Sequence, residues 1–279
     1  MKKYLLSLMF AGLMAVVFTS CEKNNEEPPV MPPYESMAID FSKFSDNTKS
    51  AAGINAETTI WNFATASLTV FAWNVVLTGT LVVPVAAFSQ AISKTPEYLG
   101  NKKWQWKFDA SGMANTYHAR MTGTIRENDV KWEMYISKTG VNAHDEFLWF
   151  EGTSKLDGNS GQWILYHSYA LQEAVLQIDW AKAGNEVGSV KYTYIRESDN
   201  IDPNQLTNGS NLEYGLGSGT LDAFYNIDYN TRNRADSANL QVNIEWSTTL
   251  YNGRIKAEHF FKDNIWHCWD SQGNDVVCE

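Results

Sequence analysis

The sequence has few of the residues and motifs on which most enzymes depend. It holds only 5 His and 3 Cys among its 279 residues. It contains no phosphate-binding glycine loop, no Gly-x-Ser-x-Gly elbow and no His-Glu-x-x-His motif. His259, Cys268 and Cys278 match no zinc-ligand spacing, so we expect no metal site and no other cofactor. These absences favour a non-enzymatic role with no catalytic residues.

Basic runs are also missing from the chain. The 22 Lys and Arg are outnumbered by 32 Asp and Glu, which gives a net charge of −10. An acidic chain repels phosphate backbones, so we expect no nucleic-acid partner. The same charge argues against electrostatic binding to anionic lipid.

A third absence is local, because no charged residue occurs between Glu57 and Lys94. A helix that is apolar all round must be covered, and Gly79 and Pro84 are natural breaks in one. We therefore predict a buried hydrophobic helical segment near 58–93, made of two pieces. Two buried strands are an alternative, since β-branched residues are frequent here. A membrane-spanning helix is another, although polar residues, Gly and Pro interrupt the run.

The rest of the chain alternates apolar and polar residues from Lys103 onward. One such segment is Val130, Trp132, Met134 and Ile136. Turn-forming residues such as Asn252-Gly253 separate many of the segments. One-sided alternation with short turns predicts a mainly β fold, an antiparallel up-and-down barrel or curved meander of about ten or more strands. A β-sandwich is the alternative. We expect one β-barrel-like domain over residues 37–279.

The N-terminus is typical of an exported bacterial chain. Lys2 and Lys3 precede an apolar run from Tyr4 to Phe18. The following Phe18-Thr19-Ser20-Cys21 resembles the lipobox of lipoproteins cleaved by signal peptidase II. That resemblance implies a signal peptide over residues 1–20 and acyl chains on Cys21 that hold the protein at a membrane. An ordinary secretory signal is the alternative.

Residues 21–36 are rich in acidic residues and proline, which predicts a flexible tether that buries nothing. The acidic run directly after Cys21 resembles the surface-export signal of Bacteroidetes lipoproteins. The resemblance implies a lipid-anchored protein of the bacterial outer membrane, at the cell surface or, alternatively, on the periplasmic face.

The two remaining cysteines, Cys268 and Cys278, lie symmetrically about Gly273 in a polar turn. This spacing predicts a hairpin that places them opposite each other, joined by a disulfide worth about 2–3 kcal/mol. Free thiols are an alternative.

Aromatic side chains suggest a binding role, since the chain has 11 Trp and 13 Tyr. Most fall on the same alternating face as the aliphatic residues, which indicates core packing. Trp149, Tyr135 and Tyr166 fall on the opposite register and form our candidate ligand-binding residues. Carboxylates within strands are candidates for glycoside hydrolysis. They are Glu133, Glu151, Asp179, Glu213, Asp228 and Glu245.

Three functions therefore stay open at this point. The first is binding of a small hydrophobic molecule or glycan, which a cavity inside the β domain would favour. The second is a structural or accessory role in a cell-surface complex with another envelope protein, which an exposed apolar patch would favour. The third is glycan hydrolysis, which two facing carboxylates in a cleft would favour.

Overall fold

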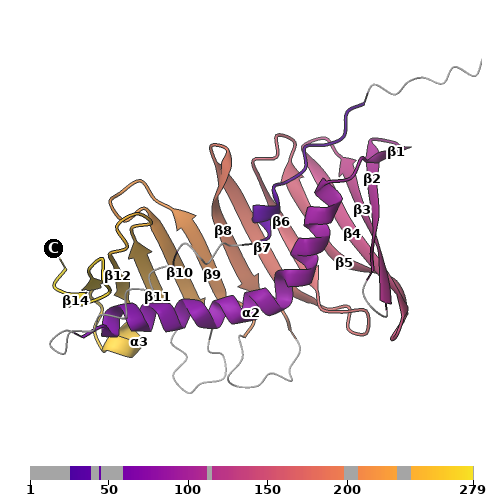
Figure 1. The fold of residues 1–279 in the computed structure, drawn as a ribbon. Coiled ribbons are helices and arrows are strands. Elements are labelled where there is room, and N and C mark those ends of the chain that lie inside the picture. Colours follow the sequence, from indigo (N-terminus) through magenta and orange to yellow (C-terminus); the bar gives the residue numbers. More distant parts are fainter. Residues whose placement is uncertain are drawn as a thin grey trace, which may run out of the picture.

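The fold is a single large sheet, described here from a computed structural model that covers residues 26–38, 44, 59–111, 115–197, 207–230 and 240–278. Its 14 strands lie in sequence order, each antiparallel to the next. Figure 1 shows them side by side, and the first and last strands are not paired with each other. The predicted antiparallel meander is therefore confirmed as an unclosed sheet, and the described strands form neither a closed barrel nor a sandwich.

In the described residues the strands are two to 12 residues long, and three helices accompany them. The strands are β1 Glu97–Gly100, β2 Lys103–Ser111, β3 Asn115–Ile125, β4 Asp129–Gly140, β5 His144–Lys155, β6 Ser160–Tyr166, β7 Ala174–Ala183, β8 Glu186–Tyr194, β9 Asn211–Leu216, β10 Ala223–Tyr229, β11 Leu240–Trp246, β12 Gly253–Lys256, β13 His267–Trp269 and β14 Asp275–Val276. The helices are η1 Tyr34–Ser36, α2 Trp61–Ile92 and α3 Glu258–Phe261.

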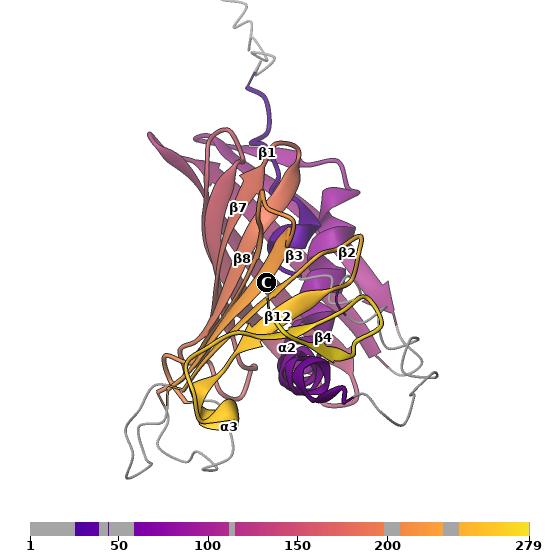
Figure 2. The same cartoon turned by 90° about the vertical axis from the view of Figure 1, so that its left-hand side faces the viewer.

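One face of the sheet forms the core of the protein. Along β4 every second residue is buried, as strand geometry requires when only one face is covered. Helix α2 crosses this face from β12–β14 toward β2, and Figures 1 and 2 together show the sheet curving around it. The core thus lies between one long helix and a curved sheet.

Aromatic contacts along its length hold α2 on the sheet. Phe63 lies against Trp269 of β13, with ring centroids 5.7 Å apart. Further along, Phe88 lies edge-on to Trp163 of β6 at 5.2 Å. At its start the carboxylate of Asp275 in β14 accepts the backbone N–H of Asn62 at 2.9 Å, which satisfies a donor that the helix itself leaves unpaired.

The helix bends sharply in the middle. Its axis turns by 64° between the arm Trp61–Thr78 and the arm Val83–Ile92. Pro84 lacks the N–H that would continue the helical bonding, and the Thr80 hydroxyl donates to the carbonyl of Val76 at 2.9 Å. The predicted helical segment is therefore confirmed, but as one continuous helix that bends between Thr78 and Val83 rather than as two separate pieces. In the described residues no single straight helix has the length and hydropathy to cross a membrane, although the two bent arms together do.

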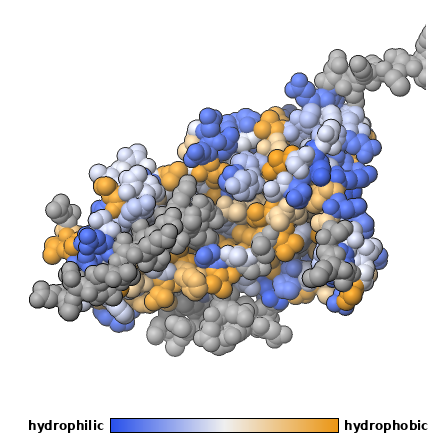
Figure 3. All heavy atoms as spheres, in the orientation of Figure 1, coloured by the Kyte–Doolittle hydropathy of each residue, from blue (hydrophilic) through white to orange (hydrophobic). Residues whose placement is uncertain are grey.

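The prediction that this segment is buried holds for one face only. The outer face of α2 carries exposed apolar side chains, among them Leu68 at 70%, Phe71 at 62% and Val75 at 56% exposure. The sheet covers one side of the helix, and no other described element lies over the opposite side. In Figure 3 apolar residues gather across this face of the molecule, along the path of α2.

The tether prediction is wrong for the part of residues 21–36 that the structure describes. From Glu26 on, this segment runs along the sheet, and Pro29, Pro32 and Ser36 are buried. The Ser36 hydroxyl accepts a hydrogen bond from the indole N–H of Trp163 at 3.0 Å. Proline is already extended and apolar, so it packs over the sheet with little loss of chain entropy.

The C-terminal hairpin forms as expected, with a disulfide between Cys268 and Cys278. Their register differs slightly from the symmetric pairing, because Cys268 of β13 lies opposite Val276 of β14. The chain leaves the ladder after Val276, and the two Cα atoms still lie 5.2 Å apart. Gly273 has φ of +84° at the turn, a conformation that favours glycine.

Candidate functional site

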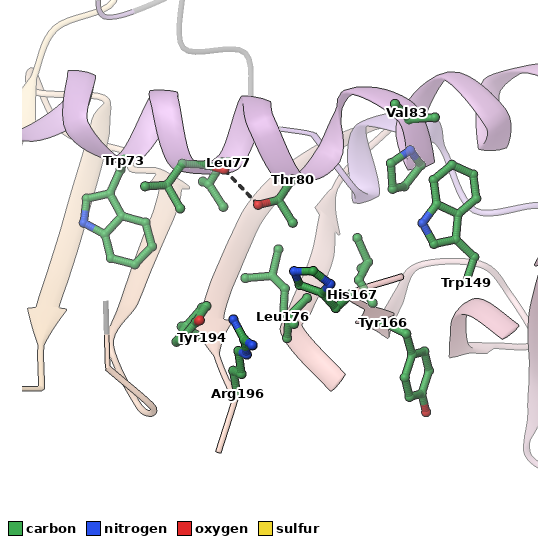
Figure 4. Close-up of a pocket in the computed structure, with 14 residues that line it drawn as sticks. Trp73, Leu77, Thr80, Val83, Trp149, Tyr166, His167, Leu176, Tyr194 and Arg196 are labelled. Carbon is green, nitrogen blue, oxygen red and sulfur yellow. Dashed lines mark hydrogen bonds between the residues drawn. The ribbon is translucent and has the colours of Figure 1, made fainter. Parts of the chain in front are cut away.

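A pocket of about 420 Å³ lies beneath the bend of α2, and we call it the bend pocket. This volume lies within the range typical of small-molecule sites. Its upper wall comes from both arms of the helix and includes Trp73, Leu77 and Val83. Its floor comes from the ends of β6, β7 and β8, where Leu176 contributes an apolar side chain (Figure 4). The bend therefore leaves a hollow where a straight helix would pack more closely on the sheet.

Two β-bulges turn apolar side chains into this pocket. On β5, Phe150 pairs with Met134 and Leu148 with Tyr135, so Trp149 is an extra residue without a partner on β4. Bulges redirect side chains and are frequent beside functional sites. Trp149 accordingly lines the pocket, and Figure 4 shows it beside Val83 of α2.

The second bulge lies on β7. There Leu176 pairs with Leu165 and Ala174 with Tyr166, which leaves Val175 as the extra residue. Val175 and Leu176 are adjacent in sequence, yet both are buried and both line the pocket. Two departures from regular strand geometry thus converge on one cavity.

Polar groups occupy the side of the pocket that faces the strand ends. His167 follows β6, and Arg196 follows Tyr194 at the end of β8. The Nε–H of Arg196 donates to the carboxylate of Glu173 at 3.0 Å, and this hydrogen bond raises the pKa of the guanidinium. The backbone N–H of Ile195 donates to the carbonyl of Val175 at 3.1 Å, which holds this segment against β7.

Of the three aromatic residues predicted to bind a ligand, the structure places only Trp149 with its ring in the pocket. Tyr135 lies on the outer face of β4, where the guanidinium of Arg120 covers its ring at 4.2 Å. Tyr166 contacts the rim of the pocket, but its ring points away from α2 in Figure 4. Its hydroxyl donates to Glu151 at 2.8 Å. The three side chains therefore form no common platform.

Burial, together with the hydrogen bond to Glu151, raises the pKa of Tyr166 to about 12. Glu151 lies directly opposite Glu133 on the neighbouring strand. The ammonium group of Lys131 bridges the two carboxylates, at 3.2 Å from Glu133 and 3.4 Å from Glu151. The candidate carboxylates thus include one facing pair, on the outer side of the sheet.

Glu133 of this pair lacks the raised pKa that the acid of glycoside hydrolysis needs. Burial would raise the pKa of Glu133, but the hydrogen bond from Lys131 and the nearby Lys103 outweigh it, so the pKa is lowered. A general acid at neutral pH requires the opposite shift. In the described part of the chain, no group of three or more His, Cys, Asp or Glu is arranged to hold a metal ion.

No protein-family model matches the chain, and neither a curated protein nor a solved structure is significantly similar to it.

Proposed function

We propose that the protein is a lipid-anchored bacterial envelope lipoprotein that binds a small apolar molecule in the bend pocket. This proposal rests on one observation: the bend of α2 and the two β-bulges place apolar side chains around the same pocket. In this proposal Cys21 holds the chain at the outer membrane, at the cell surface, through its acyl groups. The protein acts by binding and performs no chemical step.

The pocket is suited to an apolar molecule by its lining. Among its apolar lining residues, Val76 and Val83 of α2 are the most open, at 40% and 53% exposure, whereas Trp73 and Leu77 are packed on the sheet at 1% and 2%. Trp149 offers a flat aromatic face on the opposite side. Burying apolar surface in such a site stabilises a complex by about 25 cal/mol per Å² before the costs of association are counted.

A pair of neighbouring valines supplies a matched test. Val76 lines the pocket, whereas Val75 is exposed on the outer face of α2 and does not. Both are partly open to solvent, at 40% and 56%, so a larger side chain is tolerated at either position. Val76→Trp is expected to fill the mouth of the pocket, and Val75→Trp is the control.

The experiment uses residues 22–279, which include every described residue and lack only the predicted signal peptide and Cys21. A neutral naphthylamine dye that brightens in apolar surroundings is titrated into each variant. We expect saturable binding to the unmodified chain and to Val75→Trp, and binding at least about tenfold weaker to Val76→Trp. Absence of saturable binding, or equal loss in both variants, contradicts the proposal.

A second candidate function is an accessory role in a cell-surface complex, and the exposed outer face of α2 favours it. Leu68, Phe71 and Val75 form an apolar strip of the kind that marks contact surfaces. The double variant Phe71→Ser and Val75→Ser would then prevent recovery of a defined complex from the envelope while leaving dye binding intact. Recovery of the same complex from that variant would rule this candidate out.

A further inference from the structure

The described lining of the bend pocket differs in its charged residues from the chain as a whole. The protein has 32 acidic and 22 basic residues, yet none of the described residues that line the pocket is acidic. One lining residue, Arg196, carries a permanent positive charge, and His167 lies on the same polar side. Figure 4 shows both side chains below α2, on the floor of the hollow.

The geometry at Arg196 leaves its charge available to a ligand. The side chain is 26% exposed, and Glu173 accepts from Nε rather than from the two terminal nitrogens. A guanidinium has five N–H donors arranged as a planar fork, and among the described residues the hydrogen bonds with Glu173 and Tyr194 engage only part of it. Such a fork matches the paired oxygens of a carboxylate or phosphate.

Glu173 also explains why this arginine is held in place. One carboxylate oxygen accepts from Arg196 Nε at 3.0 Å, and the other accepts the backbone N–H of Glu197 at 3.2 Å. Glu173 does not line the pocket itself. It therefore acts as a positioning residue behind the guanidinium, and pre-organised groups of this kind lose little entropy when a ligand binds.

We propose that the ligand of the bend pocket is an amphiphile with an anionic head group, which pairs with Arg196 while its apolar tail lies between α2 and Trp149. This inference rests on the proposed function and adds the chemical class of the ligand. A carboxylate from a free fatty acid and a phosphate from a lipid head group share the required chemistry. The apolar tail supplies affinity and the head group supplies selectivity.

The test compares ligands that share one saturated alkyl tail and differ only in the head group. Dye displacement from residues 22–279 is measured with the carboxylic acid, the primary alcohol, the trimethylammonium salt and the monoalkyl phosphate. The acid or the phosphate is expected to bind about tenfold more tightly than the alcohol, because charge-assisted hydrogen bonds are stronger than neutral ones. A preference between acid and phosphate distinguishes a fatty acid from a lipid head group as the source.

Variants of Arg196 connect this selectivity to the guanidinium. Arg196→Gln is expected to reduce the acid-to-alcohol ratio to about one, and Arg196→Lys to keep part of the ratio. Arg254→Gln is the control, because Arg254 also pairs with a glutamate, Glu245, but does not line the bend pocket. Because each ratio is measured within one variant, a partial loss of folded protein does not alter it.

The outcomes separate the two proposals. If acid, phosphate and alcohol displace the dye equally from the unmodified chain, the head-group inference is wrong and the apolar pocket stands. Selectivity that survives in Arg196→Gln overturns the role of this arginine. If no alkyl ligand displaces a dye that binds saturably, the head-group inference fails, and the proposed function is then decided by dye binding to the two valine variants alone.

Discussion

Phe88 offers a direct test of how α2 sits on the sheet. Its side chain is 0% exposed and lies edge-on to Phe150 and Trp163, with ring centroids 6.2 and 5.2 Å away. Truncation to alanine removes roughly 150 Å² of buried apolar surface, at about 25 cal/mol per Å². Phe88→Ala is therefore expected to cost about 4 kcal/mol of unfolding free energy, within the range of about 3–5 kcal/mol for buried Phe→Ala changes.

Phe71 provides the matched control on the same helix. It is 62% exposed on the outer face, so Phe71→Ala removes little buried surface, and alanine improves the helix propensity. We expect its effect to stay below about 1 kcal/mol. Urea unfolding of both variants, followed by near-ultraviolet circular dichroism, measures the difference.

With a slope of about 3 kcal/mol per molar urea, Phe88→Ala should lower the midpoint by about 1.3 M and Phe71→Ala by less than about 0.3 M. Equal shifts in the two variants, or a larger shift for Phe71→Ala, would refute the assignment of the inner and outer faces. Two separate transitions in the unmodified chain would show that α2 does not unfold together with the sheet.

Two further predictions concern the C-terminal hairpin and the outer face of the sheet. Replacing both Cys268 and Cys278 by Ser should lower the unfolding free energy by about 2–3 kcal/mol, because their disulfide closes a short loop. Urea unfolding measures this difference, and an unchanged midpoint would mean that the disulfide adds no stability. The pKa of Tyr166 in the folded protein is about 12, against an ordinary 10.0. The stability that its protonated phenol contributes is therefore complete below about pH 10 and is lost as the pH rises to about 12. Ultraviolet titration should show this phenol ionising well above pH 10, and Glu151→Gln should lower its pKa; a titration unaffected by that change would contradict the assignment.

Much of the sheet could be predicted from the sequence, because a covered face imposes a period of two on every strand. The alternation along β4 matches its burial residue by residue. The bend of α2 was also foreseeable, since a proline inside a helix removes one hydrogen bond and its ring clashes with the preceding turn, which kinks the helix. These features depend on local chemistry alone.

The bend pocket was harder to predict from the sequence, because it forms where the strands depart from the regular alternation of inward and outward side chains. A strict alternation assigns Trp149 to the outer face, and the bulge on β5 reverses that assignment. Val175 beside Leu176 offered a weak signal, since two adjacent buried residues on a strand indicate a bulge. Arg196 lies beyond the end of its strand, and only the folded sheet brings it under α2.

The buried proline segment escaped prediction for a related reason. Pro29 and Pro32 are typical of an extended linker, yet both are buried. Their burial depends on the open, curved sheet that receives them, which composition does not reveal. The exposed strip on α2 shows a related limit of the sequence. An apolar helix indicates that some surface covers it, but the sequence does not identify that surface.

The most direct test of the central claim is mass spectrometry of what co-purifies with the soluble chain. Residues 22–279 are exported to a bacterial periplasm, purified without detergent and extracted under denaturing conditions, in parallel with Val76→Trp and Val75→Trp. The account predicts an anionic amphiphile near one molecule per chain in the unmodified protein and in Val75→Trp, and its loss from Val76→Trp. A chain that carries no such molecule, even after incubation with an envelope extract, would contradict the claim that the bend pocket is a ligand site.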